Sequence, residues 1–280
     1  MDFDADTSLT QGSSAGRWTG EIAAGWETPR GPLGGYVMAI LMHALELAVD
    51  APDRQARSVT MHFLRAPEPG PVEVSATVER RGRSLTSVSG RLEQDGELIG
   101  LALGAYSVPW ESPTLDDETP MPDVPAPDAV EEPSQSELRG QEPPSFVERM
   151  VMQHRFGEKP FSGADRGETG GWLGIRQDRP IDALAVAVLA DAWFPAPWPR
   201  LAELAPAPTI DLTIHFRSPL PVDERLLLGQ FVSRHVRDGF FEEDGLLWAP
   251  DGTLVAQSRQ LGLLLGAKTG LRRARRCAPP

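Results

Sequence analysis

The chain has 280 residues, 40% of them hydrophobic, so it is long enough to bury two cores of ordinary size. Its formal net charge of −13 argues against non-specific binding of nucleic acid or of anionic membranes. The single cysteine excludes an internal disulfide, which is compatible with a reducing compartment.

The first half begins with an acidic segment that has no apolar core, so we expect no signal peptide. No apolar run is long enough to span a bilayer, and we therefore expect a cytoplasmic protein without a membrane partner. A strand is predicted over residues 17–22. Apolar residues at helical spacing predict a buried helix over 35–49, opened by Gly34 and Gly35 and followed by Pro52. Further strands are predicted over 58–64, 72–81, 84–94 and 98–106.

Residues 108–144 are rich in proline and acidic side chains and show almost no apolar periodicity. Such a composition predicts a linker that lies over the surface or is partly mobile. It divides the chain into two halves of similar size.

The second half repeats the order of the first. Strands are predicted over 146–156 and 171–176, and a helix over 182–193 that is stopped by Pro195. This helix is apolar nearly all round, which predicts burial on most sides. Four strands are predicted to follow, over 209–216, 226–237, 239–249 and 254–265. The basic tail with Cys277 lies beyond the last apolar run, where a catalytic thiol is not expected.

The two halves also share short motifs. The segment SVTMHF at 58–63 corresponds to DLTIHF at 211–216, and DGELI at 95–99 corresponds to DGTLV at 251–255. Each Asp-Gly pair lies between strand-like runs, as hairpin turns require. We predict an α+β fold with two units, each an antiparallel sheet wrapped around a central helix. The units are residues 1–107 and 145–268, joined by the linker 108–144 and followed by the tail 269–280.

This order resembles a double hot-dog fold, and the motifs resemble the acyl-CoA thioesterase II group and its thioesterase-like relatives. The matching segments of the first half are WTGEI at 18–22, GPLGGY at 31–36 and HFLRAP at 62–67. Those of the second half are GW at 171–172, AD at 190–191, TID at 209–211, HFRSP at 215–219 and DGTLVA at 251–256, running on to Gln260.

The resemblance implies an acyl thioester hydrolase in which Asp191, Thr209 and Gln260 hold the attacking water. Aligning the halves places His43, Ala56 and Gly104 at the corresponding positions of the first unit, so the resemblance implies one active site per chain. The general base would be Asp191, because a carboxylate near the end of an apolar helix is partly desolvated and its pKa rises. Each residue also has an ordinary structural interpretation: a helix-end carboxylate, a strand threonine, and a glutamine for which Gln257 is a competitor.

The resemblance further implies that Gly34, Gly35 and Tyr36 form the oxyanion and substrate-binding segment, because free N–H groups point outward where a helix begins. Trp193, Phe194 and Trp198 are candidates for an acyl pocket or for ordinary core packing. Two arginine clusters are candidates for coenzyme A phosphates or are solvated hairpin charges: Arg80, Arg81 and Arg83, and Arg234 with Arg237.

We predict a thioester hydrolase acting on acyl-CoA or on an acyl-carrier thioester. Coenzyme A is then part of the substrate and no separate cofactor is expected. A metal site is not predicted, because His, Asp and Glu do not cluster at ligand spacing. A hot-dog hydratase or dehydratase, and a non-catalytic acyl-thioester binding protein, remain the alternatives. A homo-oligomer is compatible with the exposed sheet edges that such units have.

Overall fold

The first half of the chain carries the longer of the two central helices. The computed structural model describes residues 2–113, 115, 119–128 and 143–266. The elements of the first half are α1 (Phe3–Asp6), β1 (Thr10–Gln11), β2 (Arg17–Ile22), β3 (Glu27–Thr28), β4 (Gly31–Pro32), α2 (Gly34–Val49), β5 (Gln55–Phe63), β6 (Gly70–Arg81), β7 (Leu85–Gln94) and β8 (Glu97–Ser107). Both the helix and the long strands confirm the predicted order.

The second half has a shorter central helix than its sequence predicted. Its elements are η1 (Ser145–Arg149), β9 (Met150–Gly157), β10 (Gly167–Ile175), α3 (Ala183–Leu189), η2 (Trp198–Arg200), β11 (Thr209–Phe216), β12 (Leu227–Ser233), β13 (Val236–Arg237), β14 (Phe240–Trp248) and β15 (Leu254–Leu263). Asp182 caps α3 by accepting from the N–H of Ala185. The helix ends at Leu189 rather than at residue 193, because the N–H of Asp191 donates to Val188 in a tightened last turn.

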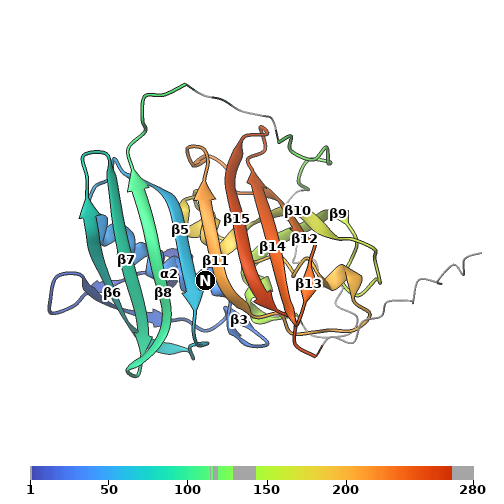
Figure 1. The fold of residues 1–280 in the computed structure, drawn as a ribbon, viewed down its shortest axis with the longest axis horizontal. Helices are drawn as coiled ribbons and strands as arrows, with labels where there is room; N and C mark the ends of the chain where they lie inside the picture. The colour runs from blue at the N-terminus through green and yellow to red at the C-terminus, as the bar shows by residue number, and fades with distance from the viewer. Residues whose placement is uncertain (1, 114, 116–118, 129–142, 267–280) are drawn as a thin grey trace, which may run out of the picture.

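One antiparallel sheet joins the two halves. In the described residues its strands follow the order β1-β2-β6-β7-β8-β5-β11-β15-β14-β12-β10-β9, with β13 on β14. Strands β5 and β11 pair directly at the centre, with Met61 opposite Leu212. Figure 1 shows the first half in blue and green beside the second half in yellow and red, with α2 behind the strands.

The duplication is visible in the details of strand pairing. A β-bulge interrupts the β5–β8 ladder between Ala56 and Ser58, and a matching bulge interrupts the β11–β15 ladder between Thr209 and Asp211. Bulges of this kind are built features that re-aim side chains. The structure therefore places Ala56 and Thr209 at equivalent positions, as the repeat alignment predicted.

The core lies between the sheet and the two central helices, which pack against each other. In α2 eleven of the sixteen residues are buried, including Met38, Ile40 and Leu41. All seven residues of α3 are buried as well. A helix that is apolar all round needs cover on every side, and the sheet and the neighbouring helix supply it. No helix among the described residues combines the length and apolar character needed to cross a bilayer.

Part of the predicted linker packs on the second half. Residues 114, 116–118 and 129–142 lie outside the described residues, as does the tail from 267 with Cys277. Met121 and Val124, however, pack on a small apolar cluster around Trp172. The indole N–H of Trp172 donates to the carbonyl of Pro125 at 2.9 Å. This part of the linker therefore covers one surface of the second half.

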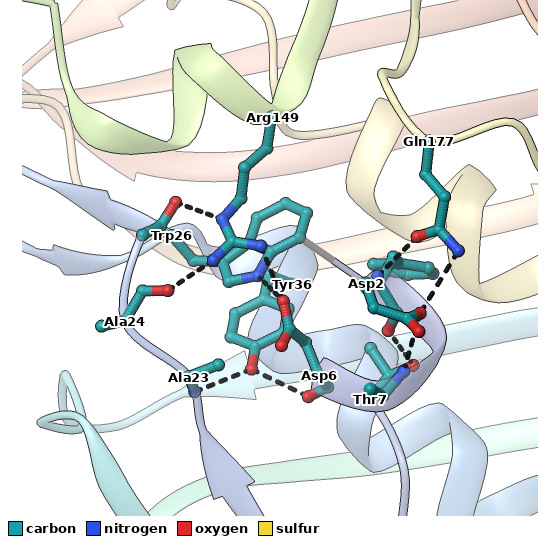
Figure 2. Close-up of polar contacts among 12 residues, drawn as sticks. Asp2, Asp6, Thr7, Ala23, Ala24, Trp26, Tyr36, Arg149 and Gln177 are labelled. Carbon is teal, nitrogen blue, oxygen red and sulfur yellow. Dashed lines mark hydrogen bonds and ion pairs between the residues drawn. The ribbon is translucent and has the colours of Figure 1, made fainter.

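Arg149 connects the halves at the N-terminal end of the chain (Figure 2). Its guanidinium donates to Asp6 Oδ2 at 2.7 Å and to the carbonyls of Gly25 and Ala24 at 2.7 and 2.5 Å. It also lies over the Trp26 ring, 4.9 Å from the centroid. The side chains of Arg149 and Asp6 are only 11% and 18% exposed, so solvent screens this ion pair little.

We expect Arg149→Met to lower the free energy of unfolding by about 3 kcal/mol, because it leaves a mostly buried Asp6 carboxylate without its cation. Urea unfolding measures the change. The matched control is Arg91→Met, which removes an exposed pair with Glu93 and should cost less than about 1 kcal/mol. Equal losses in the two variants would contradict a special role for Arg149.

Candidate active site

The two central helices meet end to side at a pair of glycines. A Cβ atom on Gly35 would lie 2.5 Å from the carbonyl oxygen of Ala187 and 2.9 Å from Cα of Val188. Only glycine allows the beginning of α2 to approach the backbone of α3 so closely. The approach brings the first turn of α2 to Asp191, and the N–H of Gly35 donates to Asp191 Oδ2 at 2.7 Å.

Thr209 and Gln260 complete the group that the sequence predicted. The hydroxyl of Thr209 lies 2.8 Å from Gln260 Oε1 and 3.4 Å from Asp191 Oδ1. Gln260 pairs with Leu212 in the β11–β15 ladder, so the side chain of Gln260 lies on the same face of the sheet as that of Leu212. Gln260, rather than its competitor Gln257, lines the cavity described below.

The β-bulge decides which face of the sheet the Thr209 side chain occupies. Strict alternation along 209–216 would put Thr209 on the face of Asp211, opposite the core-facing Leu212. The register shift between Thr209 and Asp211 adds one residue and turns Thr209 to the helix side. Its hydroxyl can reach Asp191 and Gln260 only for that reason.

Asp191 is a carboxylate with an unusually high proton affinity. Burial raises its pKa to about 6, although the hydrogen bonds from the backbone N–H groups of Gly35 and Gly34 act in the opposite direction. A carboxylate with a pKa near 6 is ionised at neutral pH and still takes up a proton readily. Those are the properties of a general base.

A fourth polar residue, Glu243, was missed by the sequence analysis. Its Oε1 accepts from Gln260 Nε2 at 2.7 Å, and its Oε2 accepts from the N–H of Ala196 at 2.6 Å. Burial raises the pKa of Glu243 to about 7. The signal was available, because Glu243 stands between Phe241 and Gly245 on the inward face of β14.

A cavity of about 510 Å³ opens beside these groups. Asp191, Thr209 and Gln260 lie on its wall, and so do Gly34 and three side chains that the sequence suggested for an acyl pocket, Trp193, Phe194 and Trp198. The remaining wall is largely apolar and includes Val37, Phe63, Met152 and Phe241. His154 from β9, which the sequence analysis did not consider, also lines the cavity and stacks near Trp193.

The cations on the cavity wall differ from those that the sequence suggested for coenzyme A. They are Arg30, Arg65 and Lys159. The suggested clusters at 80–83 and 234–237 do not line the cavity. There, Arg81 donates to the carbonyl of Val49, and Arg234 pairs with Asp244. The sequence shows that these arginines lie in hairpins, but it does not show which hairpins surround a cavity.

Tyr36 is separated from the other predicted residues. It is fully buried, and its ring stacks on Trp26 with centroids 4.6 Å apart. Its hydroxyl donates to the carbonyl of Asp6 and accepts from the N–H of Ala23, as Figure 2 shows. The next residue along a helix is turned by about 100°, so Tyr36 points to the N-terminal segment while Gly35 faces Asp191.

The first half lacks this group at the equivalent positions. Ala56 and Gly104 stand where the second half has Thr209 and Gln260. His43 has a structural contact, because its Nδ1 lies 2.8 Å from the carbonyl of Thr7. Among the described residues, no three His, Cys, Asp or Glu side chains gather as metal ligands do.

Comparisons with known proteins agree with the duplicated architecture. Residues 22–107 match the family model of the acyl-CoA thioesterase N-terminal domain, and residues 118–264 match that of the C-terminal domain. An uncharacterized protein of Mycobacterium tuberculosis is 27% identical over 271 residues, covering 88% of this chain and 90% of its own length.

Two solved structures are similar over nearly the whole chain. A hot-dog protein of unknown function from Alicyclobacillus acidocaldarius superposes with a TM-score of 0.82 at 25% identity, covering 94% of this chain and 97% of its own. A putative thioesterase II from Thermobifida fusca gives 0.76 at 26% identity, with the same coverage.

Proposed function

The chain belongs to the acyl-CoA thioesterase family, and from that premise we propose that it hydrolyses acyl-CoA by direct attack of a water held by Asp191, Thr209 and Gln260. The observation that carries the proposal is the convergence of these three side chains on one wall of a largely apolar cavity. Such a cavity suits the acyl chain, and a few polar side chains on its wall suit the thioester.

The reaction needs one proton acceptor and no covalent intermediate with the enzyme. The oxygen of the water attacks the thioester carbonyl carbon, and Asp191 takes a proton from that water. The resulting tetrahedral oxyanion collapses, the carbon–sulfur bond breaks, and the sulfur leaves as the thiolate of coenzyme A. The proton held by Asp191 then returns to that sulfur. The products are a carboxylic acid and free coenzyme A.

Gly34 and Gly35 act mainly on the base in this proposal. Both N–H groups face the Asp191 carboxylate and favour its ionised form. The positive end of the α2 dipole lies at the same place, where it also favours negative charge that develops on the substrate. The role of the two glycines as direct oxyanion donors stays a prediction.

Arg30, Arg65 and Lys159 are the candidates for the phosphates of coenzyme A. They line the same cavity as the catalytic group, whereas the overall charge of the chain is strongly negative. Cations beside the cavity can offset that background field for a polyanionic ligand, although Arg65 also pairs with Glu97 at 2.9 Å.

The experiment is an assay of thiol release from acyl-CoA substrates of increasing chain length. Release that depends on Asp191 supports hydrolysis. Because His154 lines the cavity, enoyl-CoA is included: hydration of its double bond without thiol release would favour the hydratase alternative. Binding without either reaction would favour a non-catalytic binding protein. An acyl-carrier thioester tested in parallel identifies the preferred carrier.

We expect kcat to rise with pH and to level off above pH 6 to 7, because the base must be ionised. The pKa of Asp191 is raised to about 6, so the fraction of active enzyme falls about tenfold per pH unit well below that value. A pH profile of kcat at saturating acyl-CoA measures this limb. A limb near pH 4, where an exposed aspartate titrates, would contradict the assignment.

A further inference from the structure

The hydrogen bonds of the site form a chain whose far end is Glu243. Gln260 Nε2 donates to Glu243, Thr209 lies within 2.8 Å of Gln260 Oε1, and Asp191 follows at 3.4 Å from Thr209. Glu243 and Gln260 are only 4% and 8% exposed, so water cannot readily replace these partners. The orientation of each group is therefore determined by its neighbour.

An ionised Glu243 fixes the direction of this chain because it can only accept. Its Oε2 already accepts from the backbone N–H of Ala196, and its Oε1 must face a second donor. Gln260 accordingly turns its NH₂ group to Glu243 and its carbonyl oxygen to Thr209. The single hydroxyl proton of Thr209 is then used on Gln260 at 2.8 Å, and not on Asp191 at 3.4 Å.

We propose that Glu243 is a positioning residue that directs the Thr209 proton away from Asp191. This inference rests on the proposed hydrolysis. The attacking water then faces lone pairs on three oxygen atoms: Asp191 Oδ1, Thr209 Oγ1 and Gln260 Oε1. A water that donates both of its hydrogens keeps a lone pair free for the thioester carbon.

The charges around Glu243 set the pH range in which it can play this role. Burial raises the pKa of Glu243 to about 7, and the carboxylates of Asp191 and Glu242 act in the same direction. The hydrogen bonds from Ala196 and Gln260 oppose them. Glu243 is thus ionised above neutral pH, where the Gln260 amide has one orientation only.

The test is Glu243→Gln, which keeps the shape and removes the second acceptor. The Ala196 N–H takes the new carbonyl oxygen, so the new NH₂ faces Gln260 and reverses its amide. Thr209 then donates to Asp191 and stabilises the carboxylate. We expect kcat to fall about tenfold, the acid limb to move down by roughly one pH unit, and KM to change less than about twofold.

The matched control is Glu242→Gln, which removes the same charge one residue earlier on β14. Glu242 faces the opposite side of the strand and accepts from Ser233 and Arg234. Wild-type kcat and pH profile are expected. If Glu243→Gln also behaves like the wild type in both readouts, the inference is overturned.

A double variant tests whether activity depends on the direction of the hydrogen bonds or only on the packing of the side chains. The double variant combines Glu243→Gln with Gln260→Glu. The amide oxygen at position 243 accepts from the N–H of Ala196, and the amide NH₂ donates to the carboxylate at position 260. That carboxylate also accepts from the hydroxyl of Thr209. The hydrogen bonds from Ala196 and from Thr209 keep their original directions, and only the bond between positions 243 and 260 is reversed. We expect most of the lost kcat to return, with the acid limb above that of the wild type because a carboxylate is now closer to Asp191. A double variant no faster than Glu243→Gln would overturn the inference.

Two measurements keep this outcome distinct from that of the proposed function. Melting temperatures of all variants show that they fold. If the wild type releases no thiol from any acyl-CoA, the proposed function fails. The inference is then decided by a carbon-13 NMR titration of the Asp191 carboxyl, whose pKa should be lower in Glu243→Gln and unchanged in Glu242→Gln.

Discussion

Asp191→Asn is expected to reduce thioester hydrolysis by about 10²–10⁴-fold while the protein stays folded. The amide has the shape of the carboxylate, and its oxygen can still accept from the N–H of Gly35. It cannot take a proton from the attacking water, so the loss falls on kcat. Thiol release at saturating acyl-CoA measures it, and turnover near that of the wild type would remove Asp191 from the mechanism.

The same variant should be more stable than the wild type above pH 6. In the folded chain the pKa of Asp191 is raised to about 6, whereas an unfolded aspartate titrates near 4. The folded state therefore binds more protons between these values, and its stability falls as pH rises through that window. Asparagine escapes this loss, which is on the order of 1–3 kcal/mol. Asp211→Asn, on the same strand as Thr209 but outside the cavity wall, is the control for both readouts.

Gly35→Ala is expected to damage both stability and catalysis. In an ordinary helix this change stabilises by about 1 kcal/mol, so any loss reports on the surroundings. Here the new Cβ would lie 2.5 Å from the Ala187 carbonyl and 3.0 Å from Cβ of Asp191. The two helices must separate, at a cost of roughly 1–3 kcal/mol or more. The Gly35–Asp191 hydrogen bond is lost with that movement.

Thermal unfolding and thiol release of the Gly35→Ala variant measure the two effects. Gly96→Ala is the control, because Gly96 has a φ of +78° in an open turn with no atom within 4 Å of an added Cβ. It should lose about 1 kcal/mol from backbone strain alone and keep wild-type kcat. Gly35→Ala with unchanged stability and activity would show that the helices do not meet as closely as described.

The fold could be predicted because its signals are local and repeated. Alternation along the strands and the apolar runs at 35–49 and 183–190 each need only a few neighbouring residues. The equivalence of Ala56 with Thr209 followed from aligned motifs, and the paired bulges confirm it. The end of α3 could not be predicted, because a tightened turn at Asp191, rather than the later prolines, ends it.

The site could be predicted only in part. Asp191, Thr209 and Gln260 came from resemblance, and the structure brings their side chains together. The inward position of Glu243 on its strand could be predicted, but its partners, Ala196 and Gln260, could not, because they are distant in the sequence. Tyr36 was grouped with its neighbours in the chain, although helix geometry turns it elsewhere. Long-range contacts of this kind leave little trace in a single sequence.

The pairing of β5 with β11 and the contact of Gly35 with Asp191 have a consequence for how such a chain can evolve. The first half has Ala56 and Gly104 at the positions of Thr209 and Gln260, so substitutions at these positions leave the polar group of the second half intact. Residues at the boundary between the halves are constrained, because a substitution there disturbs the strand pairing or the contact with Asp191. Substitutions in related chains should therefore be rarest where the two halves meet, along β5 and β11 and at Gly35, which contacts Asp191. They should be commoner at Ala56 and Gly104. The positions that tolerate change should therefore differ between the two halves, although the halves share one fold.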